Sequence, residues 1–275
     1  MSGPGDTHTL RLGYHHRVNF APLLYPLEAG WVGPESPWLL QTVDQRHKAL
    51  TEGLLAGDLD AAFIAPADAQ KWGSKITPLG GWGLACAGAS ETAILLAPRR
   101  IDLIDGESVD ISPQEEGSAA EHLLRTLIAP YYGVILNVST QSGEGHDRAV
   151  ARLVFGDEAV REGELAKARD EVAEDVGLAW WILTGLPMVW DVLCYRRDLD
   201  ARKPGATSSL QAAIRLSQRS AIEQASSVLD AAASSLNLKP NRLKEMFARQ
   251  TYTLGPNEQK GLATFLDMAG RAKAI

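Results

Sequence analysis

Two acidic residues stand in otherwise apolar stretches of the sequence, and each is a candidate for acid–base chemistry. Asp191 lies inside the run 188–195, and Glu91 stands just before Thr92, where another apolar run begins. A carboxylate inside a buried strand is destabilising unless it is paired or protonated. Each residue therefore either faces a cleft, where it can act as a general base, or is solvated at a junction between structural units.

Polar side chains also follow the first apolar run, Leu10 to Tyr14. His15 and His16 come directly after it, and an imidazole there can donate or accept a proton near neutral pH, although a loop histidine is more often only exposed. Asn19 comes next, and its amide either contacts a ligand or caps the helix expected from residue 20. The sequence predicts a polar site at the end of this first strand.

Other kinds of site lack their motifs. The six histidines show no HExxH pair or other metal-ligand spacing, so no metal site is expected. Neither GxGxxG nor GxxxxGK[ST], the glycine patterns of nucleotide sites, occurs, and the GxSxG of many hydrolases is absent. Cys86 and Cys194 form no CxxC and lie in apolar runs, which predicts buried, inert thiols. We therefore expect no cofactor.

The charge balance argues against nucleic acid and membrane surfaces as partners. Aspartate and glutamate number 34 against 27 lysines and arginines, which gives a formal net charge of −7. A field of that sign repels phosphate backbones and anionic lipid headgroups. A loose helix-turn-helix pattern at 233–250 is the competing interpretation, and the acidic total disfavours it. A small molecule is the expected partner.

The elements that must position these residues alternate between strands and helices. Strands are expected at 10–14, 59–65, 76–84, 92–97, 109–111, 132–138, 153–155 and 188–195. Helices are expected at 20–29, 38–55, 119–128 and 173–183, and throughout the tail from 207, with a capping box at 208–211. The alternation predicts an α/β protein with mixed, mostly parallel sheets, whose ligands bind beyond the carboxyl ends of the strands.

One stretch, Val176 to Tyr195, is apolar enough to be mistaken for a membrane span. It contains Gly185, Pro187 and Asp191, and a charge at mid-bilayer is expensive. We interpret it as a helix end, a turn and a buried strand. The polar start of the chain shows no secretory leader, so a cytoplasmic protein is expected. The sequence leaves open whether it is a monomer or a homodimer.

Six blocks of the sequence together resemble one enzyme family. They are, in order, GYHHRVNFAPLLYPLE, LLAGDLDAAFIAPADA, ETAILLAP, FGDEAVR, LAWWILTGLPMVWDVLCYRR and TYTLGPNEQKGLATFLDMA. Each block alone is weakly specific, but their order and spacing over nearly the whole chain resemble chorismate dehydratase of the futalosine route to menaquinone.

The resemblance implies a fold like that of type II periplasmic binding proteins, in which two lobes hinge shut on a ligand. The crossing strands would fall near 92–98 and 187–195. Lobe one would then comprise residues 1–95 and 192–275, and lobe two residues 96–191.

The resemblance also implies an activity, the elimination of water from chorismate to give 3-[(1-carboxyvinyl)oxy]benzoate. Such a lyase needs no metal or redox cofactor. The two carboxylates of the substrate would be held by helix N-termini, backbone N–H groups and hydroxyl or amide side chains, without any arginine.

The family's site residues map onto a small set of positions here. Asn19 matches the asparagine after the first strand, which would contact the substrate ring or its leaving hydroxyl. Thr92 stands where the family has a carboxylate-binding serine. Gly117 and Ser118 lie near a helix-start Ser-x-Thr-Ser carboxylate site, although a plain helix cap is the alternative for Ser118. Asp157 fits a Gly-Asp turn, where a structural role is the commoner interpretation.

Three departures from the family keep a second hypothesis open. Ala119 and Ala120 stand where the family has hydroxyl side chains. Asp191 stands where it has a small apolar residue, and Glu91, beside Thr92, is similarly unexpected. The main hypothesis is a chorismate dehydratase-like lyase, with Asn19, Asp191 and His15 as catalytic residues and Thr92, Ser118, Gly117, Glu91 and Asp157 binding the substrate. The alternative is a protein on the same scaffold that binds or transforms a different aromatic or cyclic acid.

Overall fold

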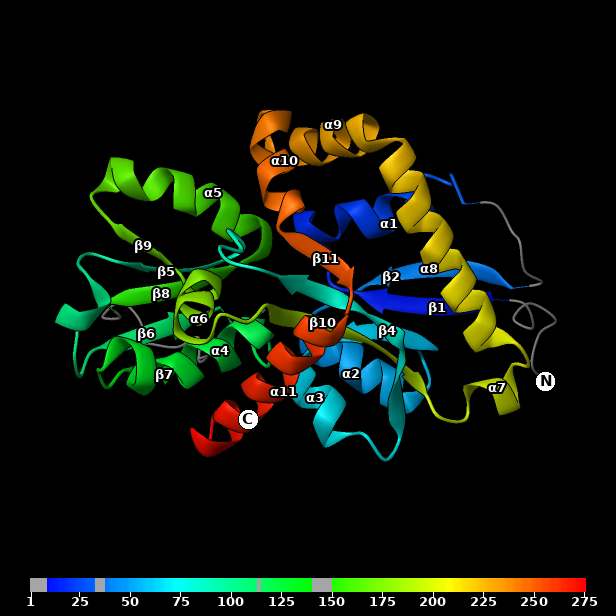
Figure 1. Cartoon of the computed structure of the whole chain (residues 1–275), viewed down its shortest axis with the longest axis horizontal. Coiled ribbons are helices and arrows are strands. Elements are labelled where there is room, and N and C mark those ends of the chain that lie inside the picture. Colours follow the sequence, from blue (N-terminus) through cyan, green and yellow to red (C-terminus); the bar gives the residue numbers. More distant parts are fainter. Residues whose placement is uncertain (1–8, 33–37, 113–114, 140–149) are drawn as a thin grey trace.

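The computed structural model describes residues 9–32, 38–112, 115–139 and 150–275. Within them, two mixed β-sheets lie side by side, each with helices packed on both faces (Figure 1). We call the six-stranded sheet with its helices the first lobe, and the five-stranded sheet with its helices the second lobe. The predicted α/β class with two mixed sheets is confirmed.

The first lobe is built on the strand order β11-β4-β10-β3-β1-β2. Its strands are β1 (Thr9–Tyr14), β2 (Leu39–Asp44), β3 (Ala61–Ile64), β4 (Ile76–Cys86), β10 (Met188–Arg196) and β11 (Gln250–Thr253). β1 pairs in parallel with β2 and β3, whereas β10 runs antiparallel between β3 and β4. The carboxyl ends of β1, β2 and β3 therefore lie together at one edge, where ligands of such sheets bind.

Helices cover both faces of this sheet, which explains why strand β3 has no polar positions. Ala61 and Phe63 of β3 pack on the side of α1 (Ala21–Glu28) and α8 (Ala206–Glu223). Ala62 and Ile64 pack on the opposite side, against α2 (His47–Ala56). A strand buried on both faces is expected to be continuously apolar. The remaining helices of this lobe are α3 (Pro66–Lys71), α7 (Leu199–Arg202), α9 (Ala225–Leu236), α10 (Pro240–Ala248) and α11 (Pro256–Arg271).

The second lobe has the strand order β7-β6-β8-β5-β9. Its strands are β5 (Ala93–Ala97), β6 (Ser108–Ile111), β7 (Asn137–Ser139), β8 (Ala151–Phe155) and β9 (Val172–Asp175). The helix α5 (Gly156–Ala166) packs on one face through Ala159 and Ala166, against Ile94 and Leu96. On the other face lie α4 (Ala119–Leu127) and α6 (Val176–Thr184).

The two lobes share one continuous apolar core. Phe155 of β8 stacks on Trp190 of β10 with ring centroids 5.7 Å apart, and Trp180 of α6 contacts Phe265 of α11 at 6.0 Å. β5 pairs only within the five-stranded sheet and β10 only within the six-stranded one. The chain thus crosses between the sheets just before β5 and just before β10. The lobe boundaries expected from the sequence stay a prediction.

Several elements differ from those expected. The predicted helix at 38–55 is strand β2 followed by α2. Of the expected strand at 132–138, residue 132 ends a helical turn, η4 (Ile128–Tyr132), residues 133–136 form no strand, and residues 137–138 lie in the short β7. Strand β9 precedes α6 where a single helix was expected, and β11 interrupts the tail that was expected to be helical throughout. Short edge strands have little apolar alternation, so a neighbouring helical pattern masks them.

Two capping predictions are also wrong. α8 begins after Gly205, so residues 208–211 lie inside the helix rather than at its start. Asn19 lies within the short helix η1 (Val18–Phe20), and no side chain caps α1. The stretch 176–195, by contrast, is the expected helix, turn and strand. Among the described residues we find no helix with the length and apolar character needed to span a bilayer.

Candidate functional site

A buried arginine in the segment after β1 pairs with the buried aspartate of β10. Arg17 Nη2 lies 2.6 Å from Asp191 Oδ2, and the two residues are only 3% and 1% exposed. The pair is half complete, because Nε and Nη1 of Arg17 and Oδ1 of Asp191 have no hydrogen-bond partner. Buried polar atoms nearly always have hydrogen-bond partners in folded proteins. These unpartnered atoms therefore mark a place where a ligand can bind.

A β-bulge helps to position this aspartate. Val189 pairs with Ala85 and Asp191 pairs with the next residue of β4, so Trp190 is an extra residue in β10. Bulges re-aim the side chains beside them and are common next to active sites. The indole Nε1 of Trp190 is itself buried without a partner. The bulge thus brings a carboxylate and an indole N–H to the interior of the lobe junction.

The second lobe contributes the other walls around Arg17. Its guanidinium lies 4.7 Å from the ring centroid of Phe155, within the range of a cation–π contact. Gly156 follows with a φ of +62°, and a Cβ at that position would come within 2.9 Å of Arg17 Cγ. Val18 N–H donates to Asp157 Oδ1 at 2.6 Å, across the two lobes. Only glycine fits at 156, and Asp157 joins the lobes through the backbone beside Arg17.

Asn19 meets Thr92 across the same junction. Its Nδ2 donates to Thr92 Oγ1 at 3.4 Å, while its Oδ1 is buried without a partner. Tyr252 O–H donates to the backbone carbonyl of Asn19 at 2.7 Å and fixes this part of the chain. The interpretation of Asn19 as a helix cap is therefore wrong, and its amide oxygen is available to a ligand.

Ser118 acts as the N-cap of α4. Its Oγ accepts a hydrogen bond from Glu121 N–H at 3.2 Å, and Glu121 Oε2 accepts one from Gly117 N–H at 2.9 Å. Ser118 therefore caps α4, but the Glu121 carboxylate bonds the residue before the cap and not the N–H of Ser118, as it would in a capping box. The motif Ser-x-x-Glu was present in the sequence. A role for Gly117 or Ser118 in binding a substrate stays a prediction.

Three further side chains form a compact group, which we call the His15 cluster: His15, His47 and Glu115. His15 Nε2 lies 3.7 Å from Glu115 Oε1, and His47 Nε2 lies 3.5 Å from Glu115 Oε2. Burial lowers the pKa of His47, so its imidazole is neutral near pH 7. Burial alone would raise the pKa of Glu115, but its contacts with the two histidines outweigh that effect and lower it.

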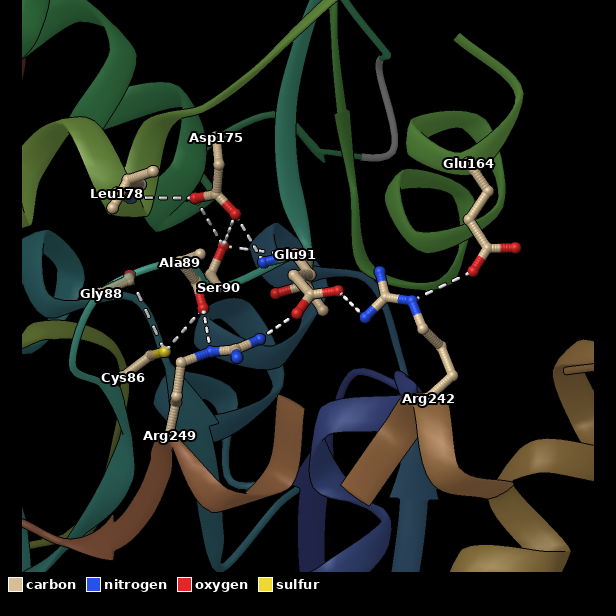
Figure 2. Close-up of polar contacts among 11 residues, drawn as sticks. Cys86, Gly88, Ala89, Ser90, Glu91, Glu164, Asp175, Leu178, Arg242 and Arg249 are labelled. Carbon is tan, nitrogen blue, oxygen red and sulfur yellow. Dashed lines mark hydrogen bonds and ion pairs between the residues drawn. The ribbon is translucent and has the colours of Figure 1, made fainter. Parts of the chain in front are cut away.

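Glu91 lies in a second group, the Glu91 cluster: Ser90, Glu91, Asp175, Arg242 and Arg249 (Figure 2). Its carboxylate pairs with Arg242 through one oxygen and Arg249 through the other. Its backbone N–H donates to Asp175 Oδ2 at 2.6 Å, and its φ of +59° is unusual for a residue with a side chain. Because its carboxylate already has two partners, substrate binding by Glu91 is a prediction that this geometry does not favour.

A cavity of about 250 Å³ adjoins the segment between β1 and α1. Tyr14, His16, Arg17, Phe20 and Tyr25 line it on one side, and helix α9 closes the other. This volume is just below the range of roughly 300–1,000 Å³ found for small-molecule pockets. Arg17 thus borders both the lobe junction and this cavity.

Sequence reasoning missed Arg17, His47 and Glu115. A signal for Arg17 did exist: a buried aspartate at 191 requires a cationic partner, and Arg17 lies between two residues already singled out, His15 and Asn19. Nothing in the local sequence distinguishes His47 or Glu115, because they lie in separate segments and only the fold brings them to His15. The expectation of carboxylate binding without an arginine did not anticipate Arg17.

The family scan identifies one family over almost the whole chain. A family model described as "Menaquinone biosynthesis" matches residues 10–271. The match covers β1 through α11 and therefore includes every residue of the site described above.

Solved structures show the same architecture. Protein AF1704 from Archaeoglobus fulgidus is 17% identical, with a TM-score of 0.77 over 98% of this chain and 100% of that chain. The alkanesulfonate-binding protein SsuA from Xanthomonas axonopodis pv. citri, bound to MOPS, is 15% identical, with a TM-score of 0.70 over 98% and 95%. The Candida albicans CA3427 gene product, described as having the generic periplasmic binding protein fold, is 13% identical, with a TM-score of 0.68 over 97% and 90%. The expected periplasmic-binding-protein-like fold is confirmed.

Proposed function

Because the chain belongs to this menaquinone biosynthesis family, we propose that it is a hydro-lyase that removes water from chorismate. The product would be 3-[(1-carboxyvinyl)oxy]benzoate. Since the product keeps the ether, the proton leaves from the ring carbon that carries the ether, and the hydroxyl leaves from the neighbouring carbon. The electron pair of the broken C–H bond closes the aromatic ring, and the proton and the hydroxyl depart together as water.

The half-complete pair of Arg17 and Asp191 is the observation that carries this proposal. Nε and Nη1 of Arg17 are buried N–H donors without partners, and a charge-assisted hydrogen bond from either of them to a carboxylate is strong. Chorismate has two carboxylates, so one of them can bind here. In a site enclosed by two lobes, such pairing is strengthened because water is excluded.

The remaining steps follow from the unpartnered acceptors beside Arg17. Asp191 Oδ1 accepts the ring proton and returns it to the departing hydroxyl. Asn19 holds that hydroxyl through its amide. Thr92 orients the amide, because its Oγ1 lies 3.4 Å from the Asn19 amide nitrogen. Ligand entry requires the lobes to part, because Val18 and Asp157 are joined across them in this conformation.

The test is direct incubation of the purified protein with chorismate. Formation of the aromatic ether is followed by ultraviolet absorbance and chromatography against the uncatalysed reaction. Asp191→Asn is expected to slow turnover about 10²–10⁴-fold, the usual contribution of a positioned acid–base group. Product formation at the uncatalysed rate by the unmodified protein would end the proposal.

A second candidate function is binding without turnover. The departures at Ala119, Ala120 and Asp191 favour it, as does the fold shared with a sulfonate-binding protein. In this case the unpartnered N–H donors of Arg17 bind an organic acid other than chorismate. Calorimetric titration with chorismate and with substituted benzoates separates the two, because tight binding of a benzoate without turnover of chorismate supports only the second.

A further inference from the structure

The His15 cluster brings together three side chains from separate segments of the chain. His15 follows β1, His47 begins α2, and Glu115 precedes α4 in the second lobe. One nitrogen from each histidine and one oxygen from Glu115 all lie within 4.8 Å of one another. His15 Nε2 lies 3.7 Å from Glu115 Oε1, and His47 Nε2 lies 3.5 Å from Glu115 Oε2. Ligands about 2.0–2.2 Å from a tetrahedral ion lie roughly 3.3–3.5 Å apart, so ion binding would draw the three side chains closer together.

The second observation is that His47 lacks hydrogen bonds although it is buried. The residue is only 3% exposed, and neither Nδ1 nor Nε2 has a hydrogen-bond partner. Its distance of 3.5 Å to Glu115 is longer than a good hydrogen bond between nitrogen and oxygen. An imidazole without partners in the interior is costly, and an ion bound at Nε2 would give one of its two nitrogens a partner.

The ligand chemistry and its surroundings agree with this. Two imidazoles and a glutamate form the donor set of one group of catalytic zinc sites, which keep one coordination position for water or substrate. His15 Nδ1 lies 3.1 Å from the carbonyl oxygen of Gln45, so a proton on Nδ1 leaves Nε2 free to face Glu115. Such an outer hydrogen bond is the usual way to fix the tautomer of a ligating histidine.

We propose that His15, His47 and Glu115 bind one divalent transition-metal ion, for which zinc is the probe. The ion would join the two lobes, because two ligands belong to the first lobe and one to the second. It would therefore stabilise the closed conformation described here. The competing interpretation is a metal-free hydrogen-bonded group of two histidines and a glutamate.

The experiment uses the full chain without an affinity tag, after dialysis against a chelator. Zinc is titrated by calorimetry, and bound metal is counted by elemental analysis after gel filtration, in the absence of any organic acid. We expect one zinc ion per chain. Cobalt(II) gives a second readout, because its visible absorption distinguishes tetrahedral from octahedral coordination.

Three variants make the assignment specific. Glu115→Gln keeps the shape of the side chain, and His47→Ala removes a buried ligand. Each is expected to weaken zinc binding at least about tenfold, the lower end of the range typical of outer-shell partners. His16→Ala is the matched control, because this neighbouring histidine is exposed and lies outside the cluster. The zinc affinity of this variant should equal that of the parent. Circular dichroism shows whether each variant folds.

Stoichiometric zinc in the parent, lost in Glu115→Gln and kept in His16→Ala, supports the site. Absence of stoichiometric zinc, or equal affinity in the folded Glu115→Gln variant, overturns it and leaves the hydrogen-bonded group. The outcome is independent of the proposed lyase activity, because no chorismate is present.

Discussion

Two charged groups lie where the lobes meet, and they differ in how completely their polar atoms are paired. In the Glu91 cluster, Asp175 accepts from Ser90 Oγ and from the backbone N–H groups of Glu91 and Leu178, and both oxygens of Glu91 face arginines (Figure 2). Around Arg17, four atoms of Arg17, Asp191 and Asn19 remain buried without any partner.

The difference separates a structural joint from a binding site. In the Glu91 cluster each carboxylate oxygen has a hydrogen bond or an ion pair, although Glu91 Oε2 meets Arg242 as an ion pair without a hydrogen bond, so the cluster fixes the relative position of the elements that it joins. Here it joins the crossing segment before β5 to α10 and to β9. An unsaturated group in the interior is tolerated when a ligand completes it. Charge alone would not have distinguished the two, since each holds arginine beside a carboxylate.

Removing Arg17 should have the largest effect. Arg17→Met leaves Asp191 buried and unpaired, so we expect a loss of about 3–5 kcal/mol in the free energy of unfolding, together with loss of organic-acid binding. Urea denaturation measures the first and calorimetric titration the second.

The double variant Arg17→Met/Asp191→Leu shows whether the pair serves binding or folding. Replacing a buried pair by apolar residues is often neutral or stabilising by about 1–4 kcal/mol, so stability should return. Binding and turnover should not return with it. If the double variant regains acid binding, Arg17 is not the anchor, and the contrast with the Glu91 cluster fails.

Asn19→Ala should reduce turnover more than it reduces stability. The side chain makes one long hydrogen bond, at 3.4 Å, so its removal should cost about 1 kcal/mol in folding. If its amide contacts the reacting hydroxyl, turnover should fall about 10²-fold, the scale seen when one such group is removed. A variant that unfolds easily but keeps its activity per folded molecule would return Asn19 to a purely structural role.

Glu91→Gln should show the opposite balance. The side chain is partly exposed, so losing the charge that pairs with two arginines should cost about 1–2 kcal/mol in folding, while the affinity for an organic acid stays within about threefold. Glu164→Gln is the matched control, since this residue pairs with Arg242 at 3.1 Å on the surface and should change stability by less than about 0.5 kcal/mol. Loss of acid binding in folded Glu91→Gln would give Glu91 the binding role that its pairing argues against.

The sequence was sufficient to predict the fold and some of the residues at the lobe junction. The carboxyl ends of β1 and β8 predict where Asn19 and Asp157 lie, whereas Thr92 stands at the start of β5, which runs antiparallel to β8. Buried strands such as β3 and β10 carry clear apolar runs. Edge strands β2, β9 and β11 lack such apolar runs, so the sequence predicted helix at those positions. The unpartnered nitrogens of Arg17 and the approach of His47 to Glu115 depend on packing between the lobes, which no local sequence pattern indicates.

The smallest expected effect is a change in the alkylation rate of one of the two cysteines when the Glu91 cluster is altered. Burial raises the pKa of both Cys86 and Cys194 to about 12, so at pH 8 only about one thiol in 10⁴ is ionised and alkylation of the native protein should be very slow. Cys86 Sγ lies 3.4 Å from the carbonyl of Ala89, which also accepts from Arg249 Nε, whereas Cys194 lies in the core of the first lobe. Glu91→Gln should therefore speed iodoacetamide labelling of Cys86 a few-fold and leave Cys194 unchanged, as mass spectrometry of the peptides would show. Equal acceleration at both thiols would mean that the variant loosens the whole protein, and that the Glu91 cluster is not a local joint.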